Sequence, residues 1–417
     1  MRLTSKFGFK TATGLAVGLA LSIAPAAAQE IKIGYSMAMT GGLGANGKSA
    51  LLAQKIWEDD VNKKGGLLGR PVKLVYYDDQ TNSSTVPGIY SKLLDVDKVD
   101  LVMGGYATNM QAPAMPMMIQ RKRLFIGLGG FGVNSEFNYQ NYFNMVATGP
   151  TPKPALTKGF FDLAVAQNPK STTVAIVSAD AEFARNVADG ARENAKAAGL
   201  TIVYDKTYPP PTTDFAPIVR AIAATNPDIV VIGSYPPDSV GFIRSVNELG
   251  FKPKMIGGGM VGLQNTAIKT QLGPLLNGWT NFDFYLPGSK LQFPGLADVL
   301  AKYQARAAAE GVDLLGYYMA PNAYAQMQVL EQAITATKSL EDAKLADYIR
   351  ASTFKTVLGD VRFGKGGEWA ESRVLQVQYR NIKGNDMAQF TTTDTQVIVS
   401  PPDYASGAIV YPFEKAQ

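Results

Sequence analysis

Residues 100–111, DLVMGGYATNMQ, limit the possible folds of this chain more than any other segment. A short apolar run, two glycines and then polar residues predict a buried β-strand that leads directly into the N-terminus of a helix. Backbone N–H groups are unpaired at such a junction and the helix dipole favours negative charge, so the junction can bind a carboxylate. Residues 228–235, DIVVIGSY, repeat this design before a second helix. The two strand ends predict two similar α/β lobes whose loops face each other across a cleft.

The composition excludes most of the common hydrolytic machinery. The 417 residues include no histidine and no cysteine, so neither a Ser-His-Asp triad, nor a Cys-His pair, nor a thiolate or imidazole zinc site can form. Asp78 and Asp79 are a possible carboxylate pair, but adjacent residues of a strand point to opposite faces of the sheet. A secreted enzyme is therefore a minor alternative. We expect no catalytic residue, no metal ligand and no cofactor.

The first residues are expected to direct export. Three basic residues precede an apolar run at residues 11–24, and the small residues 26–28 form a cleavage site before Gln29. The apolar run is too short to span a membrane well, and no later run reaches transmembrane length. We therefore predict a signal peptide over residues 1–28, cleavage near Ala28-Gln29, and a mature protein in the periplasm.

Cleavage also changes the net charge. The formal charge of +5 falls to +2 when Arg2, Lys6 and Lys10 are removed. The short basic run at residues 121–123 leads into an apolar strand, so a solvated turn explains it better than a nucleic-acid surface. We expect no nucleic acid among the partners.

Strand and helix patterns alternate along the mature chain, as in parallel sheets covered by helices. The proline-rich residues 148–154 predict a crossover between lobes, and the aromatic residues 281–286 predict the return. The strand, glycine-rich loop and helix near residues 31–63 are not expected to bind a nucleotide. The predicted fold class is α/β, with two Rossmann-like lobes of parallel sheets joined by a multi-strand hinge. We place residues 29–148 and 281–367 in lobe 1, and residues 149–280 and 368–417 in lobe 2.

Three segments resemble a known family. They are GYSMAMTGG at 34–42, NKKGGLLGRPV at 62–72 and VLGDVRF at 357–363. Together they are similar to the periplasmic solute-binding proteins of branched-chain amino acid ABC transporters, also called the leucine/isoleucine/valine-binding family. The resemblance implies a type I periplasmic binding fold, a small ligand held between the lobes, and delivery to permease subunits of an ABC transporter in the inner membrane. We also expect a monomer.

The resemblance further implies ligand-binding positions. Residues 106–109 resemble the family's carboxylate-binding loop, and residues 129–131 the loop that adds backbone donors. Phe183 and Tyr235 fall where the family places aromatic residues over the ligand, although Phe183 has an equally weighted alternative, packing beneath its own helix. The predicted ligand-binding residues are Tyr106, Ala107, Thr108, Asn109, Gly129, Gly130, Phe131, Phe183, Tyr235 and Met260.

One segment departs from the family pattern. Amino acid binders of the family place an acidic residue, which pairs with the ligand's ammonium, in the loop that here reads GGGMVG at residues 257–262. Burying an ammonium without a carboxylate partner costs on the order of several kcal/mol. We therefore expect an aromatic or branched apolar carboxylate that lacks the α-amino group. If Glu182 or Asp180 supplies the missing acid, branched-chain or other hydrophobic amino acids remain the alternative ligands; a sensory receptor domain is less favoured.

Overall fold

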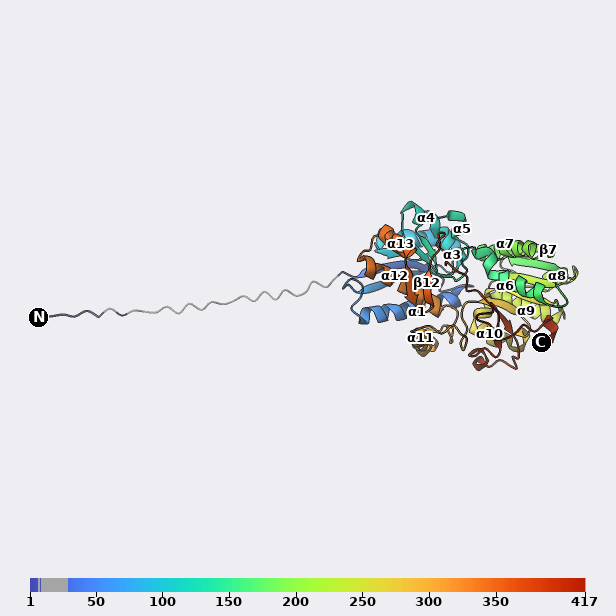
Figure 1. Ribbon diagram of the computed structural model, residues 1–417. Helices are drawn as coiled ribbons and strands as arrows, with labels where there is room; N and C mark the ends of the chain where they lie inside the picture. The colour runs from blue at the N-terminus through green and yellow to red at the C-terminus, as the bar shows by residue number, and fades with distance from the viewer. Residues whose placement is uncertain (7, 9–28, 417) are drawn as a thin grey trace.

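The chain folds into two α/β lobes that lie side by side (Figure 1). The computed structural model describes residues 1–6, 8 and 29–416, so most of the predicted signal peptide lies outside the described residues. None of the helices within these ranges is both long and apolar enough to cross a membrane. The arrangement confirms the predicted α/β fold with two lobes.

Lobe 1 is built on short parallel strands from the first part of the chain. β1 pairs with β2 on one side and with β3 on the other, and β4 pairs with β5. The Gly104 N–H donates to the Ile126 carbonyl (2.9 Å), which joins the two groups of strands. The strands are β1 (Ile31–Met37), β2 (Val72–Asp78), β3 (Leu101–Val102), β4 (Phe125–Gly127) and β5 (Tyr142–Asn144).

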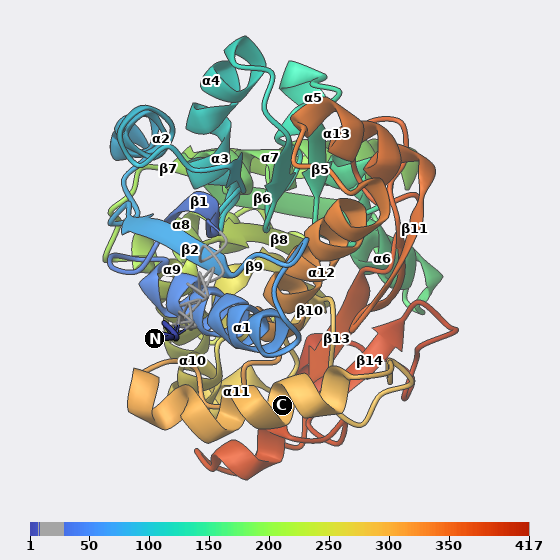
Figure 2. The same ribbon diagram turned by 90° about the vertical axis from the view of Figure 1, so that its left-hand side faces the viewer.

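Helices from two separate parts of the chain complete lobe 1. The first helix, α1, packs against α11 and α12, and α12 packs against α13 (Figure 2). A hairpin of β11 (Thr353–Thr356) and β12 (Gly359–Arg362) follows α13. The helices are α1 (Gly44–Lys63), α2 (Val86–Ser91), α3 (Thr108–Gln111), α4 (Met115–Gln120), α5 (Asn134–Phe137), α11 (Leu296–Glu310), α12 (Ala320–Thr337) and α13 (Asp342–Ala351).

Lobe 2 contains a seven-stranded sheet in the order β14-β13-β10-β9-β8-β6-β7. The strands from β10 to β7 run parallel, and the central ones are buried apolar runs, as expected for a sheet covered on both faces. β13 and β14 pair antiparallel, so the C-terminal strands depart from the predicted parallel sheets. The strands are β6 (Thr173–Ala179), β7 (Thr201–Tyr208), β8 (Ile229–Ser234), β9 (Met255–Met260), β10 (Thr280–Asp283), β13 (Leu375–Tyr379) and β14 (Gln396–Ser400).

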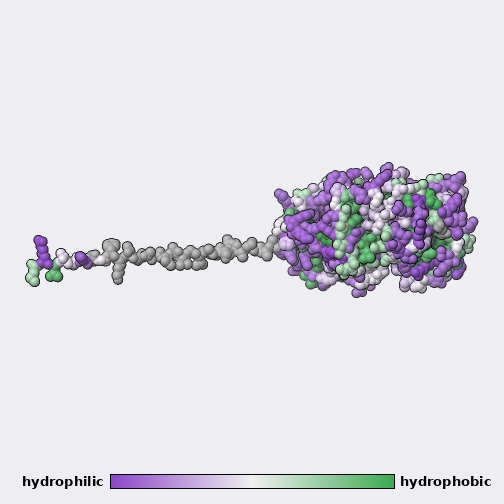
Figure 3. Space-filling model, turned by 90° about the horizontal axis from the view of Figure 1, so that it is seen from below, coloured by the Kyte–Doolittle hydropathy of each residue, from purple (hydrophilic) through white to green (hydrophobic). Residues whose placement is uncertain are grey.

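The helices of lobe 2 come from the middle of the chain. α6 packs against α7 and β9, and α8 packs against α9. Seen from below, the surface of the molecule is mostly hydrophilic, and the hydrophobic residues on this face gather in a strip near the middle (Figure 3). The helices are α6 (Pro152–Ala166), α7 (Glu182–Ala197), α8 (Ala216–Ala223), α9 (Pro236–Glu248) and α10 (Thr266–Leu272).

The chain crosses between the lobes three times, after β5, after β10 and after β12. The first and third crossovers lie side by side, because Thr148 pairs with Ser372 and the Arg373 N–H donates to the Ala147 carbonyl (2.7 Å). These contacts form the multi-strand hinge. The return crossover begins later than expected, since residues 280–283 form β10 of the seven-stranded sheet. The residue limits of the lobes stay a prediction.

The glycine-rich residues 257–260 are a strand, although the sequence suggests a loop. Glycine weakens isolated strands, but here the neighbours leave no room for a side chain. A Cβ on Gly257 would lie 2.1 Å from the Thr280 carbonyl oxygen, and a Cβ on Gly259 would lie 2.4 Å from Cγ1 of Val187. Close packing of β9 against β10 and α7 therefore explains the glycines.

The glycine-rich segment before α1 also differs from a simple loop. Residues 42–49, GLGANGKS, have the spacing of the G-x-x-x-x-G-K-[ST] phosphate-binding pattern. However, α1 begins at Gly44, so Gly47 and Ser49 lie inside the helix. A Cβ on Gly47 would lie 1.8 Å from the Ala38 carbonyl oxygen, and the Ser49 hydroxyl lies 2.5 Å from the Tyr303 hydroxyl. Both groups therefore serve packing, and the segment forms no loop around a phosphate.

Candidate ligand-binding site

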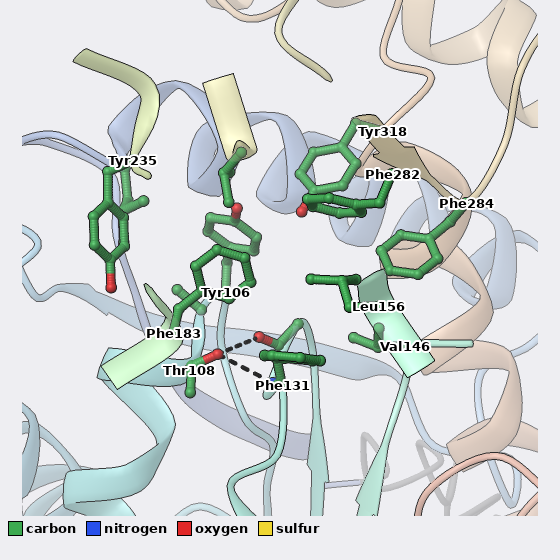
Figure 4. A pocket seen from close by; sticks show the side chains of 14 residues that line it. Tyr106, Thr108, Phe131, Val146, Leu156, Phe183, Tyr235, Phe282, Phe284 and Tyr318 are labelled. Atoms are coloured by element: carbon green, nitrogen blue, oxygen red, sulfur yellow. Dashed lines mark hydrogen bonds between the residues drawn. The ribbon is translucent and has the colours of Figure 1, made fainter. Parts of the chain in front are cut away.

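A narrow cavity lies between the two lobes, with side chains of both lobes around it (Figure 4). Its volume is about 30 Å³, enough for one or two water molecules. The lining side chains are apolar, aromatic or hydroxyl-bearing, and none of them is charged. The cavity is lined by Leu43, Tyr106, Ala107, Thr108, Gly129, Phe131, Val146, Leu156, Phe183, Tyr235, Val261, Phe282, Phe284 and Tyr318.

The structure brings together most of the residues predicted to bind the ligand. Asn109, Gly130 and Met260 do not line the cavity. Met260 is fully buried in β9, where its N–H and carbonyl bind the side chain of Asn281. Ligand contact stays a prediction for all ten residues. The seven that line the cavity are Tyr106, Ala107, Thr108, Gly129, Phe131, Phe183 and Tyr235.

A strained turn connects β3 to α3 at the cavity. Ala107 has φ 89° and ψ 144°, a conformation that costs a residue with a side chain about 1–3 kcal/mol. Its N–H donates to the Leu128 carbonyl (3.1 Å), and its own carbonyl accepts from the N–H groups of Met110 and Gln111 (3.1 Å each). These hydrogen bonds hold Ala107 in the unusual conformation and fix the start of α3 beside the cavity.

Two backbone donors are unpaired at the cavity, one at the end of this turn and one in the loop after β4. Among the described residues, no group accepts a hydrogen bond from the N–H of Thr108 or from the N–H of Gly129. Thr108 opens α3, where the first N–H groups of any helix lack an intrahelical partner. Both residues line the cavity, so their N–H groups can bind an acceptor such as a carboxylate.

The other donors expected from the sequence are already used within lobe 1. The Phe131 N–H donates to the Thr108 hydroxyl oxygen (3.1 Å), and this hydroxyl donates to the Gly129 carbonyl (3.2 Å; Figure 4). The Gly130 N–H donates to Oδ1 of Asn144 (3.1 Å). The Thr108 side chain therefore braces the 129–131 loop.

The hydroxyl of Tyr106 lies in a buried polar spot next to the cavity. It accepts a hydrogen bond from Nδ2 of Asn46 (3.0 Å), and the Tyr106 ring contacts the Tyr318 ring edge to face with centroids 6.4 Å apart. Burial raises the pKa of Tyr106 to about 12. The hydroxyl is therefore protonated at neutral pH and adds no charge to the site.

Aromatic rings form the opposite wall. The Phe183 ring centroid lies 5.4 Å from that of Phe131, 6.1 Å from that of Tyr235 and 6.4 Å from that of Phe282. These separations are typical of favourable tilted and edge-to-face pairs. Phe183 is buried in the core and also lines the cavity, among aromatic residues of both lobes, so the choice between ligand contact and core packing stays open.

The two acids considered for an ammonium partner lie outside the lining. Asp180 is exposed and pairs with Arg185 (2.8 Å). Glu182 is half-buried; burial raises its pKa, and the negative charge of Glu136 adds to this shift. No carboxylate therefore faces the cavity from the side chains that line it.

Several lining residues were missed from the sequence. Phe282 and Phe284 belong to the aromatic segment assigned to the return crossover, so a signal was present but was interpreted as a linker. Tyr318 lies in the loop before α12, and no motif distinguishes it there. The remaining four are aliphatic residues that resemble ordinary core positions, namely Leu43, Val146, Leu156 and Val261.

The fold and the cavity define a class of protein, in which two α/β lobes hold a small molecule between strand-end loops. The chain belongs to the periplasmic binding protein family, whose model matches residues 30–384. The family consists of extracytoplasmic binding proteins, not enzymes, which bind small molecules and work with ABC transporter permeases.

Individual relatives and solved structures agree with this assignment. The chain is 26% identical over 391 residues to the Leu/Ile/Val-binding protein homolog 8 of Brucella abortus, covering 89% of this chain and 94% of the relative. A leucine-binding protein of Thermotoga maritima has a TM-score of 0.72 at 19% identity, covering 84% of this chain and 96% of that one. A solute-binding protein of R. palustris in complex with 4-hydroxybenzoate has a TM-score of 0.70 at 19% identity, covering 85% and 94%.

Proposed function

We propose that this protein captures a small aromatic or branched apolar carboxylate between its lobes and delivers it to the permease subunits of an ABC importer in the inner membrane. One observation carries the proposal: the cavity presents aromatic rings and unpaired backbone N–H groups, but no charged side chain. Such a surface suits an apolar body that ends in a hydrogen-bond acceptor.

The lack of a charged side chain argues against an ammonium group in the ligand. A buried ammonium needs a carboxylate partner, and losing that partner costs on the order of several kcal/mol. Asp180 is engaged by Arg185 and Glu182 lies outside the lining. A carboxylate, in contrast, can accept hydrogen bonds from the N–H group of Thr108, at the start of α3, and from the N–H group of Gly129, in the loop after β4.

A ring-sized ligand requires the lobes to separate, because the cavity is only about 30 Å³. The three crossovers allow such a hinge motion, which is the common way in which two-domain binding proteins admit and enclose a ligand. We therefore infer that the lobes open to admit the ligand and close around it.

Three similar proteins suggest candidate ligands. The R. palustris protein was solved with 4-hydroxybenzoate, an aromatic acid without an amine, and the T. maritima protein is named as a leucine binder. The relative in Brucella is named for leucine, isoleucine and valine, which favours amino acids as the second candidate. The uncharged lining of the present cavity favours the acid.

Matched ligand pairs test the proposal. We would measure thermal unfolding of residues 29–417 with leucine and 4-methylpentanoate, and with phenylalanine and 3-phenylpropanoate, because each pair differs only in the amine. Ligand binding to the folded state raises the melting temperature by mass action. We expect the amine-free acids, and benzoate, to stabilise the protein, and 3-phenylpropanamide to have little effect. If only the amino acids, leucine or phenylalanine, stabilise the protein, the proposal of an amine-free acid as ligand is refuted and an amino acid ligand is supported.

The proposal also includes how the mature protein is made and organised. We infer export with cleavage near Ala28-Gln29, a monomer, and lobes that follow the limits predicted from the sequence except at β10, whose residues 281–283 belong to lobe 2: 29–148 plus 284–367, and 149–283 plus 368–417. The intact mass of the exported protein tests the cleavage site. Light scattering at several protein concentrations tests the monomer, and a mass that rises with concentration would contradict it.

A further inference from the structure

Two asparagines join the lobes beside the cavity. Oδ1 of Asn109, in α3, accepts hydrogen bonds from the Tyr235 hydroxyl (2.9 Å) and from the Phe183 N–H (3.1 Å). In the opposite direction, Nδ2 of Asn186, in α7, donates to the Phe131 carbonyl (2.9 Å). We call these three hydrogen bonds the asparagine latch.

Asn109 contacts the residues that line the cavity without lining it itself. Tyr235 precedes α9 and Phe183 lies in the first turn of α7, so one oxygen atom holds the beginnings of two helices of lobe 2. The Phe183 N–H has no intrahelical partner, as is general for the first turn of a helix. Asn109 therefore satisfies a backbone donor of lobe 2 that would otherwise need water.

The latch also determines what Tyr235 can offer to a ligand. A phenol has one proton, and here the proton is donated to Asn109. Burial raises the pKa of Tyr235, so the hydroxyl remains a neutral donor. Tyr235 therefore presents its ring face, and no hydrogen-bond donor, to the cavity.

We propose that Asn109 is a positioning residue that holds Tyr235 and Phe183 over the bound ligand, and thereby sets how fast the ligand is released without selecting which ligand is bound. The identity of the ligand rests on the proposed function above. The latch itself rests on hydrogen bonds between lobes that must break when the lobes separate.

Two variants separate the latch from the wall of the cavity. Tyr235→Phe keeps the ring but removes the hydrogen bond to Asn109, whereas Asn109→Ala removes both hydrogen bonds to Oδ1. Asn247→Ala, at an exposed asparagine of α9, is the matched control. Because one neutral hydrogen bond contributes on the order of 1 kcal/mol, Tyr235→Phe should raise the dissociation rate of 3-phenylpropanoate about fivefold and Asn109→Ala somewhat more.

Stopped-flow binding measures these rates and provides two further readouts. We expect association rates to change less than twofold, and the order of affinities for benzoate, 3-phenylpropanoate and 4-methylpentanoate to stay the same. The Asn109→Ala/Tyr235→Phe double variant should match Asn109→Ala, because the same hydrogen bond is absent in both. An altered order of affinities would show that Asn109 contacts the ligand and would overturn the proposal, as would unchanged dissociation rates.

A measurement without ligand keeps the two proposals distinguishable. Hydrogen exchange of the Phe183 amide, followed by NMR, reports directly on the hydrogen bond to Asn109. Exchange should be at least several-fold faster in Asn109→Ala than in the wild type and unchanged in Asn247→Ala. If no acid binds the wild type, the proposed function fails while this exchange still decides the latch. Equal Phe183 exchange in Asn109→Ala and the wild type would refute the latch.

Discussion

The two lobes present different chemical groups to the cavity. On the lobe 1 side, the 106–108 turn and the 129–131 loop expose backbone N–H groups, and a chain of internal hydrogen bonds through Thr108 and Asn144 holds them. On the lobe 2 side, Phe183 and its aromatic neighbours form a wall whose contacts are mainly between ring faces and edges. Lobe 1 therefore adds directional hydrogen-bond donors to its own apolar residues, whereas lobe 2 contributes mainly apolar area.

This difference teaches how a cavity without charged side chains can suit an anion. Backbone donors do not titrate and are held by the fold, so lobe 1 can bind a carboxylate without burying a lysine or arginine. The rings of lobe 2 add area and exclude water but contribute little directional preference. If the proposed function is correct, lobe 1 recognises the acid group of the ligand and lobe 2 its apolar body.

The largest effect is expected from a buried acid behind the lobe 1 loop. Oε2 of Glu368 accepts a hydrogen bond from Nδ2 of Asn144 (2.9 Å), and Asn144 in turn holds the Gly130 N–H. Burial raises the pKa of Glu368 from 4.5 to about 8. Between these values the folded protein binds more protons than the unfolded chain, so its free energy of unfolding falls as the pH rises.

Glu368→Gln should remove this pH dependence, because the amide keeps the hydrogen bond to Asn144 and cannot ionise. We expect the variant to be about as stable as the wild type at pH 5 and more stable at pH 8, by about 2–4 kcal/mol. Urea unfolding at pH 5, 6.5 and 8 measures the difference. Parallel pH profiles of the two proteins would show that Glu368 is ionised in the folded state.

Removing an aromatic ring from lobe 2 is the next largest change. Phe183→Ala should weaken the binding of 3-phenylpropanoate by about 2–3 kcal/mol, because a buried aromatic anchor at the centre of a site contributes this much. Phe183→Leu, which keeps apolar volume, should recover part of the loss. Calorimetric titration measures both variants, and acids with different bodies should be affected to different degrees. A small loss of affinity that is the same for all acids would indicate that Phe183 only packs beneath α7 and does not contact the ligand.

A smaller effect, but a more specific one, is expected on lobe 1. Thr108→Val keeps the shape of the side chain but removes the hydroxyl that braces the Gly129 carbonyl and the Phe131 N–H. We expect carboxylates to bind about 1–2 kcal/mol more weakly, because loss of the Thr108 hydroxyl misplaces backbone donors that the carboxylate uses. The affinity for a weakly bound neutral amide should be nearly unchanged, since the amide does not use these donors. Thr108→Ser should restore binding. Equal losses of affinity for the carboxylate and for the amide would contradict the assignment of carboxylate recognition to lobe 1.

The lobe 1 side was easier to predict from the sequence than the lobe 2 side. An apolar run followed by Gly104 and Gly105 predicts the strand-to-helix junction, because local sequence determines it, and Thr108 and Gly129 indeed line the cavity. The role of Asn109 could not be predicted in this way. Its partners Phe183 and Tyr235 are 74 and 126 residues away and belong to the other lobe.

The glycine strand and the aromatic wall show the same limit. Residues 257–260 have low strand propensity, and only the close approach of β10 and α7 makes a strand of glycines favourable. Phe282 and Phe284 were assigned to a crossover, because nothing in an aromatic segment alone distinguishes the end of a buried strand from a linker. Contacts between distant segments decide both cases.

The smallest effects are expected from the two acids considered as partners for an ammonium group, and they test whether an amine could be bound after all. Glu182→Gln and Asp180→Asn remove the two carboxylates considered as partners for an ammonium, and neither side chain lines the cavity. Affinities for amine-free acids should change less than twofold, because Asp180 is exposed and salt-bridged and because Glu182 does not line the cavity. Calorimetric titration with 3-phenylpropanoate and with phenylalanine measures both ligands. If Glu182→Gln loses phenylalanine binding while the affinity for 3-phenylpropanoate is unchanged, lobe 2 recognises charge. This result would contradict the assignment of only apolar contacts to lobe 2.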